Sequence, residues 1–201
     1  MGLFDEQTPE EYLAKCNRLK ARTVNNNVRA NTLHEAMKKL GCDAGPLETL
    51  VQCISRADVG PESMIQGGFV PHVPETQGDE PYVPKIVIVA EHVHGKSVFD
   101  RTLTHELVHA FDQCRANVQW GNLHHLACAE IRASNLSGEC ELIQEINRGN
   151  AGVVKHHQTC VRRRAALSIA MGMGKTEAAK AAEAVNAVFD KCYADKAPFE
   201  D

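Results

Sequence analysis

Apolar side chains recur at helical spacing over several segments of the chain, and this pattern predicts a mostly helical protein. A first helix is expected to begin at Thr8-Pro9, because Thr8 can cap the first turn and Glu11 lies at the position that completes a capping box. A second helix is predicted over about 27–40, with Gly41 as its end. Further helices are expected at 97–111, 122–135, 139–148 and 155–170, and from about 177 onward.

One segment has the pattern of a buried strand. Residues Lys85–Glu91 are mostly β-branched and apolar, which favours an extended conformation. By contrast, residues 60–84 are rich in glycine and proline and show no periodicity, so a loop is expected there. The predicted fold class is therefore α+β, mostly helical with a small β-sheet.

Composition narrows the class of protein. The chain has 201 residues with 22 Lys and Arg against 26 Asp and Glu, so no basic excess points to nucleic acid. Its purest apolar run, Ile86–Ala90, is far shorter than the roughly 20 residues of a membrane span. The first dozen residues include four acidic ones, so neither a secretory signal nor an Arg-rich presequence is expected.

Eight cysteines are spread along the chain, and none forms a C-x-x-C pair. A zinc-ribbon site and a thioredoxin-type redox pair are therefore not indicated. Two interpretations remain, buried free thiols that pack as small apolar side chains, or structural disulfides formed in an oxidising compartment. Composition does not decide between them.

The clearest chemical motif is H-E-x-x-H at residues 105–109, inside a predicted helix. Residues four apart lie on one face of a helix, about 6 Å apart at Cβ, so His105 and His109 can reach one Zn²⁺ ion. Zinc lowers the pKa of a bound water toward about 7, and Glu106 is placed to take its proton. The uncharged flanks, among them Thr102, Thr104 and Phe111, favour this interpretation over a solvated helix face.

Two histidines leave zinc short of a third protein ligand. Glu130 is favoured, since it lies 21 residues after His109 on the next predicted helix, as in two-His-one-Glu zinc peptidases. Asp112 is a weaker alternative and is more plausible as an acceptor that orients an imidazole N–H. His124 and His125 are further alternatives.

Four features have open interpretations. The carboxylate of Glu130 can instead form an ion pair with Arg132 or Arg115. The strand at 85–91 either forms the edge of a substrate cleft or lies at the centre of a small sheet. We expect the pair His156-His157 to have a structural role, and stabilisation of an oxyanion is the alternative. We expect Arg162–Arg164 to form a solvated helix face, and contact with a membrane surface is the alternative.

Several runs of residues resemble the mitochondrial ATP synthase-processing metalloprotease family. The resemblance covers most of residues 67–199 and is carried by Thr104–Arg115, Trp120–Leu123, Ala127–Ala133, Asn135–Cys140 and His156–Val161.

This resemblance implies a minimal zincin-like metallopeptidase in one domain, residues 1–201. It would have a helical N-terminal part (8–41), a loop-rich part (60–84) and a catalytic core (85–199). His105 and His109 would be zinc ligands and Glu106 the catalytic residue, while the family motif does not settle whether Glu130 is the third ligand. The resemblance also favours disulfides, because family members are trapped by oxidative folding.

The resemblance further implies a location and a partner. Family members are peripheral proteins of the mitochondrial inner membrane that face the intermembrane space. They remove the N-terminal extension of the ATP synthase subunit 6 precursor and assist assembly of the membrane sector. The alternative function is that of an assembly chaperone in which the metal site is dispensable or structural.

Overall fold

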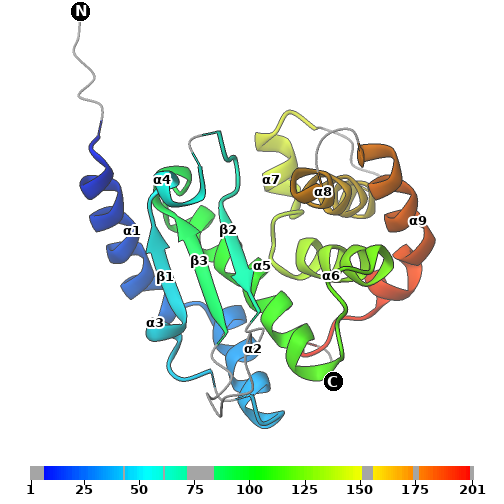
Figure 1. Cartoon of the computed structure of the whole chain (residues 1–201), viewed down its shortest axis with the longest axis horizontal. Helices are drawn as coiled ribbons and strands as arrows, with labels where there is room; N and C mark the ends of the chain where they lie inside the picture. The colour runs from blue at the N-terminus through cyan, green and yellow to red at the C-terminus, as the bar shows by residue number, and fades with distance from the viewer. Residues whose placement is uncertain are drawn as a thin grey trace, which may run out of the picture.

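The structure is a computed structural model that describes residues 7–42, 44–60, 62–71, 84–150, 156–173 and 177–199 (Figure 1). Its helices are α1 (Pro9–Val24), α2 (Val28–Lys39), α3 (Leu47–Leu50), α4 (Arg56–Val59), α5 (Lys96–Arg115), α6 (Leu123–Leu136), α7 (Leu142–Asn147), α8 (His156–Met173) and α9 (Ala178–Ala194). Its strands are β1 (Val51–Ile54), β2 (Gly67–Val70) and β3 (Lys85–Val89). The fold is α+β and mostly helical, as predicted.

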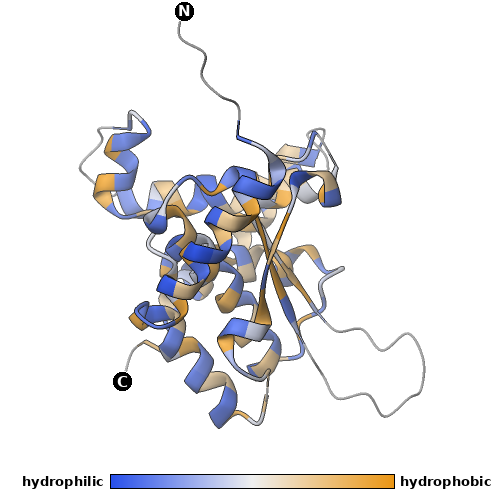
Figure 2. Ribbon diagram, turned by 90° about the vertical axis from the view of Figure 1, so that its left-hand side faces the viewer, coloured by the Kyte–Doolittle hydropathy of each residue, from blue (hydrophilic) through white to orange (hydrophobic). Residues whose placement is uncertain are grey.

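The three strands form one mixed sheet in the order β1-β3-β2. β3 is parallel to β1 and antiparallel to β2, with Ile86 opposite Val51 on one side and Phe69 on the other. β3 is therefore central, and β2 is an edge strand. Figure 2 shows these strands as an apolar layer, and Ile86 and Ile88 are fully buried.

The sheet differs from the sequence-based expectation in two ways. β3 ends at Val89, and residues Ala90–His92 form a turn of 3₁₀ helix instead of continuing the strand. The segment 60–84 contains β2, although a loop was predicted; residue 61 and residues 72–83 of that segment lie outside the described part. β2 has only four residues and begins with two glycines, so it lacks a local strand signal and depends on pairing with β3.

The first two predicted helix starts agree with the observed caps. Thr8 accepts a hydrogen bond from the backbone of Glu11, and the Glu11 carboxylate accepts one from the backbone of Thr8. Asn27 caps α2 through the backbone N–H of Ala30. The predicted helix at 97–111 is longer than expected and runs to Arg115.

The buried apolar residues form two clusters. One lies between the sheet and helices α1, α2 and α5, and the other lies among α6, α8 and α9. In Figure 1 the sheet layer and the helical layer stand side by side, with α5 behind the sheet and β2 as the strand nearest the helices. Because α5 also packs against α6, these two helices form the junction between the clusters.

All eight cysteines are paired in disulfides, so the free-thiol interpretation is wrong. The pairs are Cys16–Cys53, Cys42–Cys114, Cys128–Cys192 and Cys140–Cys160. The first two stay within the sheet half of the molecule and the last two within the helical half. No described helix is long and apolar enough to cross a membrane.

Candidate active site

Helix α5 presents the H-E-x-x-H motif from its buried middle. Its residues Leu103, Leu107 and Val108 are fully buried, so the packing of the apolar face fixes how the helix is rotated. His105 and His109 lie one turn apart on the same side, with ring centroids separated by 4.9 Å. Glu106 is also buried.

Helix α6 brings Glu130 to the two histidines. Its Oε2 lies 3.3 Å from Nε2 of His105, and its Oε1 lies 3.6 Å from Nε2 of His109. One ligand atom from each of the three side chains can be chosen so that all lie within 4.8 Å of one another. The arrangement places two imidazoles and one carboxylate around a common point.

The chemistry of this group fits a divalent cation. Oε2 of Glu130 is buried and accepts no hydrogen bond from the described residues. Burial lowers the pKa of His109 to about 4, so this imidazole is neutral and has a lone pair to donate. Two imidazoles and one carboxylate are a common ligand set of catalytic zinc.

His105 has a different electrostatic setting. Burial opposes its charged form, but contacts with Glu130 and Glu139 outweigh this and raise the pKa of His105 well above its usual value. The two carboxylates therefore favour the protonated form of His105 when no cation is bound. A bound cation would displace that proton, as is general for protein metal sites.

Glu139 has a place in the site that the sequence did not indicate. Its Oε1 lies 3.3 Å from Nδ1 of His105, on the side of the ring away from Glu130, and its Oε2 accepts a hydrogen bond from Arg164 at 2.7 Å. These neighbours hold the pKa of the Glu139 carboxyl well below its usual range, against the effect of burial. Glu139 is 34 residues from His105, so no local spacing rule links them. A carboxylate behind a ligating imidazole fixes the tautomer and orientation of the ring.

Glu106 is held at the wall of the site by strand β2. Burial raises the pKa of its carboxyl to about 7, and a hydrogen bond from the backbone N–H of Phe69 opposes this shift. Gly67 approaches closely, since a Cβ at this position would lie 3.3 Å from Cγ of Glu106. A carboxyl group with a pKa near neutrality is suited to act as a general base.

Asp112 does not have the role predicted for it. It neither joins the ligand group nor orients an imidazole; its carboxylate accepts hydrogen bonds from Arg115 at 2.8 Å and from Arg132 at 2.9 and 3.0 Å. The side chain of Arg132 is 1% exposed and also contacts Asp195 at 2.6 Å. This network joins α5, α6 and the segment after α9. Because it occupies both arginines, the predicted alternative of an ion pair with Glu130 is not observed.

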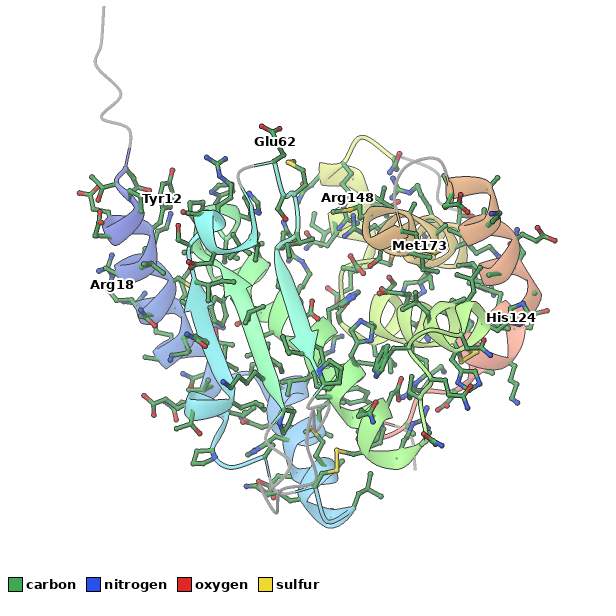
Figure 3. All side chains as sticks on the ribbon, viewed as in Figure 1. Tyr12, Arg18, Glu62, His124, Arg148 and Met173 are labelled. Atoms are coloured by element: carbon green, nitrogen blue, oxygen red, sulfur yellow. A yellow bond between two sulfur atoms is a disulfide. The ribbon has the colours of Figure 1, made fainter. Side chains whose placement is uncertain are left out.

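His124 and His125, the other alternative ligands, lie outside the group. Both are exposed at the first turn of α6, where Asn122 caps their backbone N–H groups. Nδ1 of His125 accepts a hydrogen bond from the backbone of Gln119. Figure 3 shows His124 on the outer side of the helical layer.

The pair His156-His157 and the basic run Arg162–Arg164 lie outside the ligand group, and their contacts are of a structural kind. His157 lies 2.9 Å from the hydroxyl of Tyr193, and neither His156 nor His157 lines the cleft described below. The basic run is not a free positive surface. Its side chains pair with acidic residues, Arg162 with Asp190, Arg163 with Glu145 and Arg164 with Glu139.

A cleft of about 500 Å³ opens at His105 and Glu106. Residues 64–67 form one wall, α5 forms the floor, and residues of α7 and α8 form the opposite wall. On another side of the site, the ring of Trp120 packs edge-on against the ring of His109, with the ring centroids 5.8 Å apart. It also packs against the ring of Phe69, with the centroids 5.9 Å apart. The sequence analysis gave Trp120 no role of its own; it only belonged to one of the runs that carry the family resemblance.

Comparisons with known proteins agree on one family. The family model described as the peptidase M76 family matches residues 14–200. The chain is 38% identical over 186 residues to the "Mitochondrial inner membrane protease ATP23 homolog" of Homo sapiens, covering 92% of this chain and 69% of that protein. It is 32% identical over 198 residues to the "Mitochondrial inner membrane protease atp23" of Schizosaccharomyces pombe, covering 98% of this chain and 97% of that protein.

No solved structure matches the chain. The zincin-like part of the predicted fold class therefore stays a prediction.

Proposed function

The chain belongs to the peptidase M76 family, and on this premise we propose that it is a zinc metalloendopeptidase of the mitochondrial inner membrane. The observation that carries the proposal is the meeting of His105, His109 and Glu130 beside the buried carboxylate of Glu106, at the floor of a cleft.

Each side chain has a role that follows from its position. His105, His109 and Glu130 would hold the ion, and Glu139 would orient the ring of His105. When bound, zinc supplies a Lewis acid that polarises a carbonyl group and lowers the pKa of water. Glu106 accepts a proton from the attacking water and passes it to the leaving amine, for which a pKa near 7 is well matched.

The substrate would bind in extended form along β2. This strand lies at the edge of the sheet, and no strand of the described residues pairs with its side away from β3. The backbone N–H of Phe69 points from this side to Glu106, so the free edge faces the catalytic carboxylate. An extended polypeptide can add to such an edge through backbone hydrogen bonds.

The proposed physiological substrate is the N-terminal extension of the ATP synthase subunit 6 precursor. The protein would act as a peripheral protein on the intermembrane-space side. The relatives' names support the membrane, the family resemblance supports the substrate, and four disulfides suit an oxidising compartment.

Replacement of Glu106 by Gln tests the proposal. The amide keeps the shape of the side chain but cannot accept the proton, so maturation of the precursor should stop while zinc remains bound at one ion per chain. The test uses mitochondria that lack the endogenous peptidase, with Glu48→Gln, an exposed residue of α3, as the matched control.

Two outcomes separate the candidate functions. If maturation stops but the ATP synthase still assembles, the protein has both a peptidase and an assembly role. If maturation continues with the Glu106→Gln variant, or the purified protein binds no metal, the peptidase proposal is refuted and the chaperone alternative gains support.

A further inference from the structure

Arg101 is a cation on the floor of the cleft, one helical turn before His105 on α5. Positions four apart are neighbours on a helix surface, so Arg101 and His105 lie on the same face. The side chain is partly buried, and the hydrogen bond it donates goes to the hydroxyl of Ser97. Among the described residues, no carboxylate oxygen lies within 4.0 Å of its guanidinium group.

The acidic residues around Arg101 are already bonded to other cations. They act on its pKa through space, but each has a closer partner: Asp100 pairs with Lys96 at 2.5 Å, Glu139 with Arg164 at 2.7 Å and Glu141 with Arg29 at 3.0 Å. Arg101 is thus a guanidinium group that faces the cleft and has no acidic partner among the residues that the structure describes. A partly desolvated cation of this kind gains from an incoming carboxylate.

A second positive charge stands beside it. Arg148 lies at the end of α7 (Figure 3). It lines the same cleft, and its charge lowers the pKa of Arg101 by repulsion. Nη1 of Arg148 is fixed by Glu145 at 2.8 Å and by the carbonyl of Glu139 at 2.6 Å. The amide side chains of Gln144 and Asn147 line this wall as well. An anion placed here would meet two guanidinium groups and two amide donors.

We propose that Arg101 and Arg148 form a subsite for an acidic side chain of the polypeptide substrate, and that Arg101 determines specificity for it. The inference rests on the proposed peptidase function and deepens it. Met64, Leu167 and Met171 line the cleft around the subsite and are 74%, 47% and 44% exposed. The preferred substrate therefore carries an Asp or Glu with apolar neighbours, near the scissile bond.

Cleavage of matched peptides tests the subsite. The probes are quenched-fluorescent decapeptides of alternating Ala and Leu, in which one position at a time is Glu, Gln or Lys. At one position, the zinc-loaded protein should cleave the Glu peptide with kcat/KM about 10-fold or more above that of the Gln peptide, as expected for charge-assisted hydrogen bonds.

Variants of Arg101 test whether this residue causes the preference for the Glu peptide. In Arg101→Gln the Glu-to-Gln ratio of kcat/KM should fall to about one, in Arg101→Lys it should persist, and in Arg101→Glu the Lys peptide should become the better substrate. Arg18→Gln, on the exposed surface of α1 far from the cleft, should keep the wild-type ratio (Figure 3). No acidic preference in the wild type, or the same preference in Arg101→Gln, would overturn the proposal.

A binding measurement separates this proposal from the peptidase function. Fluorescence anisotropy of the Glu and Gln peptides is measured on the full chain with Glu106→Gln, alone and combined with Arg101→Gln. If the wild type cleaves nothing but the Glu peptide binds about 10-fold tighter through Arg101, the peptidase proposal fails and the subsite stands. If neither cleavage nor selective binding occurs, both are refuted.

Discussion

Replacing Gly67 by alanine should destabilise the protein at the contact between β2 and α5. A Cβ at this position would lie 2.7 Å from Cγ2 of Thr102, 3.0 Å from the carbonyl oxygen of Val87 and 3.3 Å from Cγ of Glu106. Contacts this short force the strand or the helix to move. Overpacking of this kind costs about 1–3 kcal/mol.

The neighbouring glycine is a matched control. A Cβ at Gly68 would meet only Cγ2 of Val87, at 3.5 Å, which is ordinary van der Waals contact. Gly68→Ala should therefore be neutral or stabilise the fold by about 0.4–1 kcal/mol, because alanine restricts the unfolded chain. Both effects are measured as free energies of unfolding in urea with the disulfides intact.

Thr102→Ser provides a rescue, because serine lacks the methyl group that makes the shortest contact. The double variant Gly67→Ala, Thr102→Ser should regain part of the lost stability, so the two changes should be non-additive by about 0.5 kcal/mol or more. If Gly67→Ala is as stable as Gly68→Ala, or Thr102→Ser restores nothing, the close approach of β2 to α5 is refuted.

Three further predictions concern the site and the disulfides. Glu139→Gln should weaken zinc binding about 10–100-fold, because the amide orients His105 less well, and competition with a chelator measures the dissociation constant; unchanged affinity would contradict the role of Glu139. In the metal-free protein the pKa of Glu106 is raised from 4.5 to about 7, so the folded state holds this proton more tightly and stability is lost as pH rises through that window. The free energy of unfolding in urea of metal-free Glu106→Gln should fall less over this pH range than that of the wild type. Identical pH profiles of the two proteins would refute the raised pKa of Glu106. Removing the Cys128–Cys192 disulfide with serines should cost about 4 kcal/mol, since it spans 64 residues, and an unchanged urea midpoint would contradict this.

Local features of the chain were determined by the sequence alone. The helix cap at Thr8 and the helical spacing of His105 and His109 depend only on residues three or four apart, so they can be predicted without knowledge of the fold. Glu130 was favoured as a partner by its distance along the chain, and the structure places it beside both imidazoles, while its role as a metal ligand stays a proposal.

Other features were decided only by the tertiary structure. The pairing of the cysteines, the edge position of β2 and the contact of Glu139 with His105 each join segments that are far apart in the chain. Asp112 shows the same limit, because the sequence predicted it as an acceptor that orients an imidazole, whereas packing of α6 presents Arg132 to it instead. Such contacts depend on how whole helices and strands pack together, and a local sequence pattern does not determine which distant side chain packs against it.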